Sequence, residues 1–374
     1  MNNDGNNTDI GRVSIEFAAD GSLPITATNE VAEVLDKELS AIRDKKQNVC
    51  YTDEKGRFLI GEMYGGFNQK AHLAKQSKVR YRSNIIADNV DFDELQCFAF
   101  SKRGEMHFAT STIRQDSYAI AGYPVERYGT SFGTRYFVAA VADGVSSAAR
   151  SHQLADAMVC AATSTVTEVL EEFDGSDITL IDWVAISDKL VLESLLFCRK
   201  LLKREYESLE KDVEEIEAIP AKAYTDYWAT TLEFVVVESV KSCDGFRKYV
   251  HVAVTGDGSA YVVGDNGFSK VRNGKENTGF FASNAVKNPL PMNPIKQSVN
   301  TGKLGSQDIF LLVTDGFGDL INNKNSGFTE FLNDKLINST NCRSLPSLFQ
   351  IFEAATYQMD DDRTCVLIRE KEKD

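Results

Sequence analysis

Four aspartates at turns that border apolar runs constrain this chain more than any other feature of its sequence. In chain order they are Asp116, Asp143, Asp315 and Asp361. The apolar runs at 137–141 and 309–313 have the length and the β-branched content of buried strands. The pattern therefore predicts acidic side chains at the ends of strands in the core of the fold.

An acid in such a place must be solvated, paired or bound to metal, because a bare carboxylate in a core is very costly. Several carboxylates brought together repel one another unless a hard divalent cation neutralises them. Ligation by oxygen alone favours Mg²⁺ or Mn²⁺ over zinc or copper. The four aspartates thus predict a carboxylate metal site.

The composition excludes several other classes of protein. A formal net charge of -14 argues against a nucleic-acid binder, which usually has a basic surface. The seven cysteines are scattered and never form a C-x-x-C pair, which is typical of reduced thiols in the cytoplasm and offers no zinc-ligand spacing. No stretch approaches the roughly 18 apolar residues of a membrane helix, and the N-terminus does not resemble a signal peptide. We expect a soluble cytoplasmic protein.

The first 95 residues differ in texture from the rest of the chain. We expect residues 1–95 to form an N-terminal extension of unknown role and residues 96–374 to form the domain that carries the four aspartates. Within the extension the pattern predicts a helix near 31–42, a strand at 57–64 and a solvated basic stretch at 69–82.

From residue 96 onward the sequence alternates between strand-like runs and helical periods. Strands are predicted at 96–101, 117–121, 137–142, 231–238, 249–255, 260–263, 308–314 and 364–369. Long helices are predicted at 148–173 and 178–219, short ones around 327–337 and 345–358, and an irregular crossing segment at 273–303. Strands, two long helices and then more strands indicate an α+β layered domain.

Six short motifs, in their order along the chain, resemble those of the metal-dependent serine/threonine protein phosphatases of type 2C (PPM-type). They are Gln115-Asp116-Ser117, Val141-Ala142-Asp143-Gly144, Thr230-Thr231-Leu232, Gly256-Asp257-Gly258-Ser259-Ala260-Tyr261, Thr314-Asp315-Gly316-Phe317-Gly318-Asp319 and Asp361-Asp362-Arg363-Thr364. An upstream segment, Ser101-Lys102-Arg103-Gly104-Glu105-Met106-His107, resembles the opening of a bacterial branch of this family. One such motif is weak evidence, but six in family order over roughly residues 96–370 are specific.

This resemblance implies a four-layer α-β-β-α sandwich, in which helices flank two antiparallel sheets and the metals lie at one end. It also implies two Mn²⁺ or Mg²⁺ ions. The implied ligands are Asp116, Asp143, Gly144 through its carbonyl, Asp257, Asp315, Asp319 and Asp361. Asp143 would bridge the two ions. Asp315 and Asp361 would complete the shell of one ion, and Asp116 would hold the other. A third, weaker site would combine Asp315 with Asp257 and Asp319, although these two also read as structural turns.

The resemblance further implies that a hydroxide bridging the metals attacks phosphorus, so that no protein nucleophile is needed. His107 is a candidate donor of a proton to the leaving alkoxide, and its other interpretation is an ordinary loop histidine. The main branch of the family has a phosphate-binding Arg where this chain has Ser111. Arg103 or Arg114 is therefore expected to bind the phosphate.

Other polar residues near the motifs have plainer interpretations. Thr230 and Thr231 are expected to satisfy hydrogen bonds at a strand end. Asp362 is expected to be a flanking surface acid, and His251 is expected to be structural. The leading hypothesis is a Mg²⁺- or Mn²⁺-dependent phosphatase that hydrolyses phosphoserine or phosphothreonine on proteins, with a Ser/Thr kinase as a candidate partner. The alternatives are a pseudophosphatase or regulatory module of the same fold, and a phosphatase of a small phosphorylated molecule.

Overall fold

The computed structural model describes the greater part of the chain after residue 83. The described residues are 84–104, 106–107, 112–124, 135–173, 177–208, 216, 219–272, 288–294, 297–322, 328–333, 336 and 361–371. All of them belong to the larger of two units of the chain, residues 48–374. The predictions at 31–42, 57–64, 69–82 and 345–358 lie outside the described residues.

One sheet has six strands, and each strand is antiparallel to its neighbours. In spatial order they are β1 (Ile85–Phe92), β2 (Leu95–Lys102), β11 (Arg363–Glu370), β10 (Ile309–Val313), β7 (Ser259–Gly264) and β8 (Gly267–Arg272). The last strand of the chain lies between β2 and β10, with Arg363 opposite Lys102 and Cys365 opposite Val313. This pairing carries the C-terminal acidic motif to the segment that follows β2.

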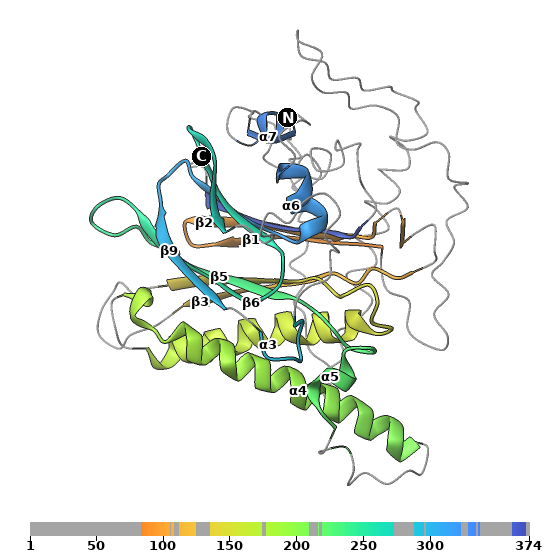
Figure 1. Ribbon diagram of the computed structural model, residues 1–374. Coiled ribbons are helices and arrows are strands. Elements are labelled where there is room, and N and C mark those ends of the chain that lie inside the picture. Colours follow the sequence, from red (N-terminus) through yellow and green to blue (C-terminus); the bar gives the residue numbers. More distant parts are fainter. Residues whose placement is uncertain are drawn as a thin grey trace, which may run out of the picture. The chain divides into compact units, whose positions relative to one another are not determined.

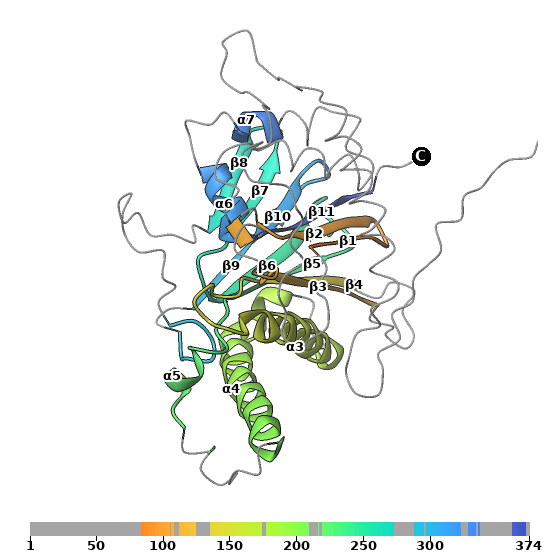
Figure 2. The ribbon, with the colours of Figure 1, turned by 90° about the vertical axis from the view of Figure 1, so that its right-hand side faces the viewer.

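The second sheet has five antiparallel strands and stacks against the first (Figure 2). In spatial order they are β3 (Ser117–Pro124), β4 (Arg135–Ala142), β5 (Leu232–Glu238), β6 (Arg247–Thr255) and β9 (Ser298–Leu304). Phe137 and Val235 from this sheet pack with Phe310 and Val366 from the other in a core between the sheets. Every residue of β5 is buried, because the opposite face of this sheet is covered by helices.

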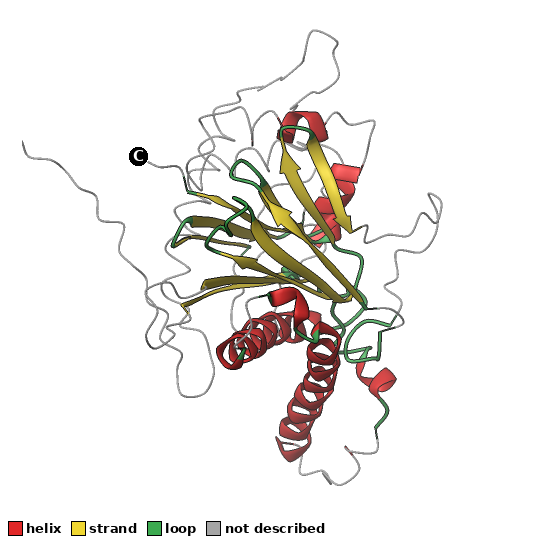
Figure 3. Cartoon of the chain, turned by 90° about the vertical axis from the view of Figure 1, so that its left-hand side faces the viewer, coloured by secondary structure: helices red, strands yellow, loops and turns green. Residues whose placement is uncertain are grey.

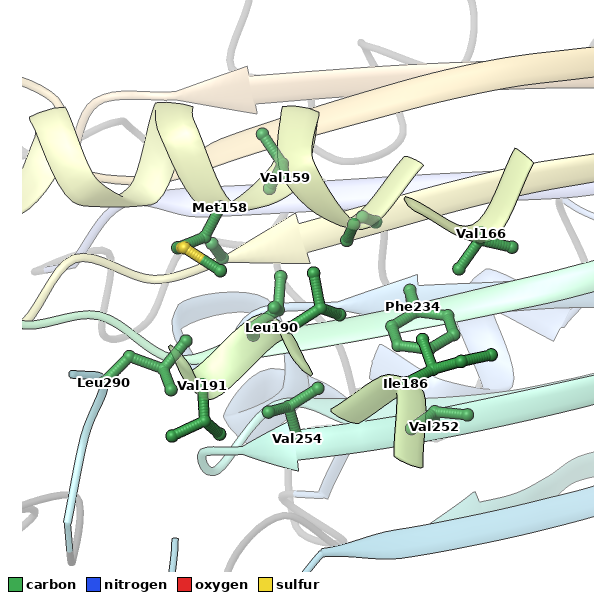
Figure 4. Packing of buried hydrophobic residues seen from close by; sticks show 14 of the residues in the cluster. Met158, Val159, Val166, Ile186, Leu190, Val191, Phe234, Val252, Val254 and Leu290 are labelled. Atoms are coloured by element: carbon green, nitrogen blue, oxygen red, sulfur yellow. The ribbon is translucent and has the colours of Figure 1, made fainter. Parts of the chain in front are cut away.

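Two long helices, α3 (Ser151–Glu172) and α4 (Trp183–Ser208), cover the outer face of the five-stranded sheet (Figures 1 and 3). Figure 4 shows Met158 of α3 and Leu190 of α4 in the apolar cluster that also contains Phe234 and Val252. The helix α3 forms because apolar residues recur at helical spacing, from Leu154 through Met158 and Val166 to Leu170, and all four are buried. None of the described helices is long and apolar enough to cross a membrane.

Shorter helices complete the fold. The 3₁₀ turn η1 (Ile178–Leu180) precedes α4, and α5 (Ala221–Tyr224) precedes β5. The helices α6 (Asp315–Asn322) and α7 (Phe328–Asn333) lie on the outer side of the six-stranded sheet (Figure 1). The predicted α+β sandwich of four layers, with helices outside two antiparallel sheets, is confirmed.

The structure differs from the sequence predictions in several places, and β8 and α6 were not predicted. The segment at 273–303, predicted to be irregular, contains the start of β9, an edge strand whose polar residues alternate between half-buried and exposed. Within the predicted helical stretch 178–219, the long helix is Trp183–Ser208. Strand β1 pairs with β2, so the sheet includes residues 85–92 of the predicted extension. The division of the chain at residue 95 otherwise stays a prediction.

Candidate metal centre

Three aspartates from separate turns meet at one end of the sandwich. Asp143 follows β4, Asp257 lies between β6 and β7, and Asp315 is the first residue of α6 after β10. Each offers a carboxylate oxygen, and these oxygens all lie within 4.8 Å of one another. All three side chains are half-buried. The fold thus gathers hard oxygen ligands at the spacing that a divalent cation requires.

The turn that carries Asp143 is held by the two threonines at the start of β5. Thr230 Oγ1 and Thr231 N each donate to the Asp143 carbonyl oxygen at 2.8 Å. In return, Asp143 N donates to Thr231 Oγ1 at 2.8 Å. Both threonines therefore satisfy hydrogen bonds at a strand end, as predicted, and they fix the backbone of Asp143.

Two glycines after the aspartates allow close approach of the backbone. A Cβ at Gly144 would lie 2.8 Å from the Gln115 carbonyl oxygen and 2.9 Å from Ser151 Cβ. A Cβ at Gly316 would collide with the Asp362 carbonyl oxygen. Only glycine fits at either position without a shift of the backbone, so the Asp-Gly pairs are required by packing at the site.

Asp116 lies at the start of β3, between the ends of the two central strands of the other sheet. It is 1% exposed, and its Oδ2 accepts from Thr314 Oγ1 at 2.7 Å and from Thr364 Oγ1 at 2.8 Å. Thr314 ends the run of β10, and Thr364 belongs to β11. The carboxylate of Asp116 therefore ties the two sheets together beside the cluster.

Asp362 is not the surface acid that the sequence suggested. It is 1% exposed and accepts from Gly104 N at 2.7 Å, from Asp116 N at 3.3 Å and from Gln115 N. Its Oδ1 also lies 2.8 Å from His107 Nδ1. Adjacent residues of an extended segment point to opposite sides, so one of the two acids before β11 must point inward. That alternation was the signal that sequence reasoning missed.

His107 is held between the two acids of the C-terminal motif. The residue is 8% exposed, its Nδ1 bonds to Asp362, and its Nε2 lies 3.9 Å from Asp361 Oδ1. The Asp361 side chain is 46% exposed, so this face of the imidazole is near the open side of the motif. The imidazole is thus a buried, oriented group rather than a solvated loop side chain.

A sequence model of the family described as protein phosphatase 2C matches residues 103–351. The chain belongs to the protein phosphatase 2C family. The match ends before the motif at 361–364, but β11 places that motif against Gly104 and Gln115 within the same fold. The site of this protein phosphatase 2C chain therefore combines residues inside the segment that the family model matches with residues outside it.

Solved structures of bacterial phosphatases are also similar to this protein phosphatase 2C chain. RsbX in complex with magnesium is 13% identical with a TM-score of 0.42, and the alignment covers 76% of this chain and 100% of that one. A bacterial serine phosphatase is 12% identical with a TM-score of 0.47, covering 76% and 100%. Stp1 from Staphylococcus aureus is 11% identical with a TM-score of 0.47, covering 79% and 100%. A search of curated protein sequences finds no significant match.

Burial and charge repulsion together disfavour the charged forms of three aspartates at this phosphatase 2C site. Burial raises the pKa of Asp143 well above its usual range, and the charges of Asp116, Asp315, Asp361 and Asp257 raise it further. Burial, Asp362 and Asp361 raise the pKa of Asp116 to about 8, against the hydrogen bonds from its threonines. Burial, then Asp315 and Asp362, raise the pKa of Asp361 to about 6. A divalent cation would relieve this repulsion, so the donor set fits a hard metal ion.

The buried pair beside the cluster behaves differently. Burial alone would raise the pKa of Asp362, but the hydrogen bonds and charge of His107 and the Gln115 and Gly104 amides hold it below its usual value. Burial alone would lower the pKa of His107, but the hydrogen bond and charge of Asp362, followed by the charge of Asp361, raise it. The two residues therefore stabilise each other in their charged forms.

The two arginines expected to bind phosphate are both buried. Arg103 is 1% exposed, and it donates to the His107 carbonyl at 2.7 Å and to Asn84 Oδ1 at 3.1 Å. Arg114 is 3% exposed, and it donates to Ser101 Oγ at 2.7 Å and to the carbonyl of Asp116. The described contacts give both side chains a scaffolding role, and phosphate binding by either stays a prediction.

Asp319 stands apart from the three clustered carboxylates. It lies one helical turn after Asp315 on α6 and is exposed. The cluster of Asp143, Asp257 and Asp315 forms without it. Its share in a third metal site of this phosphatase 2C chain stays a prediction.

Proposed function

We propose that this chain is a metal-dependent phosphatase that hydrolyses phosphoserine and phosphothreonine on proteins in the cytoplasm. The observation that carries the proposal is the meeting of the Asp143, Asp257 and Asp315 oxygens within 4.8 Å of one another. Membership of the protein phosphatase 2C family supports the reaction class. Scattered cysteines without C-x-x-C spacing support the compartment.

The proposed metal ligands are the three clustered aspartates, together with Asp116, Asp361 and the Gly144 carbonyl. Two Mn²⁺ or Mg²⁺ ions, when bound, would supply the hydroxide that attacks phosphorus and would neutralise charge on the phosphoryl group. The chain holds the aspartates in position before any substrate arrives. The two threonines just before β5 fix the turn of Asp143, and Thr314 just after β10 and Thr364 of β11 fix Asp116.

His107 is the proposed proton donor to the alkoxide that leaves. Its Nδ1 is bonded to Asp362, which fixes the orientation of the ring and leaves Nε2 on the side of Asp361. An oriented imidazole whose charged form is favoured is suited to protonate a serine or threonine oxygen. Asp362 acts through His107 and through the backbone of Asp116, and it is a positioning residue.

One observation favours a second candidate, a pseudophosphatase or regulatory module of the same fold. Ser111 stands where the main branch of the family has its phosphate-binding Arg, and Arg103 and Arg114 are both engaged within the protein. In that case residues 1–95 would recruit a phosphorylated partner. A small phosphorylated molecule is the other candidate substrate.

Hydrolysis of a phosphothreonine peptide with and without Mn²⁺ tests the proposal. We expect activity that requires Mn²⁺ or Mg²⁺, that disappears with a chelator, and that is lost in Asp143→Asn. Asp244→Asn is the matched control, because Asp244 is an exposed acid in the turn between β5 and β6, at the other end of β5 from the cluster. Full activity without metal, or equal activities of the two variants, would contradict the proposal. Binding of phosphopeptide without hydrolysis would favour the second candidate.

A further inference from the structure

A carboxylate and an imidazole form a pair in the apolar core between the two sheets. Glu233 of β5 is 1% exposed and His251 of β6 is 0% exposed. Glu233 Oε2 lies 2.9 Å from His251 Nε2, and the imidazole ring packs 6.4 Å from the ring of Phe310 between centroids. Burying such a pair costs free energy that a pair of apolar residues would not. The position of the pair, next to the turn that carries Asp257, indicates what the pair contributes to the fold.

The carboxylate of Glu233 lies directly beneath the turn that carries Asp257. A Cβ at Gly258 would lie 2.9 Å from Glu233 Oε1 and 2.9 Å from the Val313 carbonyl oxygen. Gly258 is thus packed between a carboxylate oxygen of β5 and the backbone of β10. A side chain at position 258 would have no room while Glu233 stays in place, so the turn approaches the carboxylate closely.

Gly256, which precedes Asp257, packs closely against Thr231. Gly256 has a φ of +134°, a conformation that a residue with a side chain rarely adopts. A Cβ there would lie 2.5 Å from Thr231 Cβ. Thr231 in turn accepts from Asp143 N. Thr231, just before β5, and Glu233 of β5 therefore support the two flanks of Asp257.

The strand pairing is irregular at this point. Leu232 pairs with Thr255 and Glu233 pairs with Ala253, so β6 has one additional residue, Val254, beside them. Such bulges redirect side chains and are common next to functional sites. On the far side, His251 Nδ1 lies 3.4 Å from Asn300 Nδ2 of the edge strand β9. His251 is thus flanked by polar groups on both sides, and its imidazole holds Glu233 in place.

We propose that Glu233, held by His251, is a positioning residue that fixes the Asp257 turn and thereby sets the affinity of the three-aspartate cluster for its divalent cation. The inference rests on the proposed function only in requiring that the cluster binds a cation. Glu233 acts through Gly258 and does not itself serve as a ligand.

Calorimetric titration of the full-length protein with Mn²⁺ tests the inference without measuring catalysis. Glu233→Ala removes the support beneath Gly258, and we expect it to weaken Mn²⁺ binding roughly ten-fold, as loss of groups that orient metal ligands typically does. Glu233→Gln keeps the shape and a hydrogen bond to His251, and we expect it to bind Mn²⁺ nearly as the wild-type protein does. The second variant is His251→Gln, which keeps Glu233 unsubstituted but removes the imidazole that holds its carboxylate. It should weaken binding in the same direction.

Val237→Ala is the matched control. Val237 lies four residues along the same strand, faces the same core and is 0% exposed, and its partners on the neighbouring strands are Phe137 and Tyr249 rather than His251. It should lower the melting temperature and leave Mn²⁺ binding unchanged. Unchanged binding in Glu233→Ala, or in His251→Gln if Glu233→Ala does not fold, would overturn the inference. An equal loss in Val237→Ala would overturn it as well. Absence of Mn²⁺ binding by the wild-type protein would instead overturn the proposed function, and the inference with it.

Discussion

Two adjacent carboxylates, Asp361 and Asp362, have opposite surroundings at the residue scale. The side chain of Asp361 is 46% exposed, and its pKa is raised to about 6 by burial and by neighbouring acids. Asp362 is fully buried, but four donors surround its carboxylate and hold its pKa low. The fold therefore disfavours the charged form of Asp361 and stabilises the charged form of Asp362.

Substitution of these two residues should therefore change stability in opposite directions. In a chelator, Asp362→Asn should lower the free energy of unfolding by about 3 kcal/mol, because it breaks a buried charged network. Asp361→Asn should leave the stability unchanged or raise it, since it removes a repelled charge. Urea unfolding of both variants measures the difference. Equal losses of stability in the two variants would contradict the surroundings assigned to Asp361 and Asp362.

The role of His107 predicts a dependence on the leaving group. His107→Gln should reduce hydrolysis of a phosphothreonine peptide by roughly 10²-fold, a typical loss for a general acid. Hydrolysis of p-nitrophenyl phosphate should fall much less, because nitrophenolate leaves without a proton. Steady-state rates on both substrates measure the ratio. The control is His152→Gln, at a half-buried histidine in the first turn of α3. Equal losses on the two substrates would remove the proton-donor role.

At the element scale, strands buried on both faces were predictable, whereas three of the edge strands, β1, β8 and β9, were not. β10 is a continuous run of apolar residues, β4 is one after Arg135, and the apolar run of β5 is interrupted only by Glu233 before Glu238 ends it. β9 is polar and lies at a sheet edge, where only half of its residues need be apolar. The helix α6 was missed because Asp315-Gly316 reads as a turn, although Asp315 is the first residue of a helix.

The candidate site likewise contains features that the sequence predicted and features that it did not. Short motifs in family order located the acids, since each one lies at the end of a strand. The partners of those acids come from distant segments, as when Gly104 and Gln115 donate to Asp362. No local pattern encodes which groups meet there, and for this reason neither the donors to Asp362 nor the packing of Glu233 against Gly258 was predicted.

Packing between elements predicts different costs at two glycines. In Gly316→Ala the new Cβ would meet the backbone oxygen of Asp362, which cannot move without shifting β11, so we expect a loss of about 3 kcal/mol in stability. Gly245→Ala has open space around its Cβ, and its φ of +83° alone should cost about 1 kcal/mol. Chemical denaturation compares the two. A smaller loss at Gly316 than at Gly245 would contradict the close approach of α6 and β11.

At the scale of the whole molecule, the six-stranded sheet joins both ends of the described chain. β1 pairs with β2, and β11 pairs with β2 on its other side. Asn84, just before β1, accepts from Arg103 through both its backbone and its side chain. The N-terminal boundary of the catalytic fold therefore affects the segment that carries His107.

Truncation tests this boundary. A protein that begins at Asn84 should keep metal-dependent hydrolysis of p-nitrophenyl phosphate, and one that begins at Gln96 should lose stability, because it lacks β1 and the partner of Arg103. A start near Asp91 cuts β1 and should resemble the shorter protein. Melting temperatures and hydrolysis rates compare the three. Full stability of the protein that begins at Gln96 would contradict a structural role for β1.

The most direct measurement of the central claim is an anomalous-scattering map from crystals soaked in Mn²⁺. The account predicts a peak within roughly 2.0–2.3 Å of carboxylate oxygens from Asp143 and Asp315, with Asp257 at the same centre. It also predicts that the peak disappears in Asp143→Asn. A map without a peak at these residues, or with its Mn²⁺ bound elsewhere on the protein, would contradict the assignment of this cluster as the metal centre.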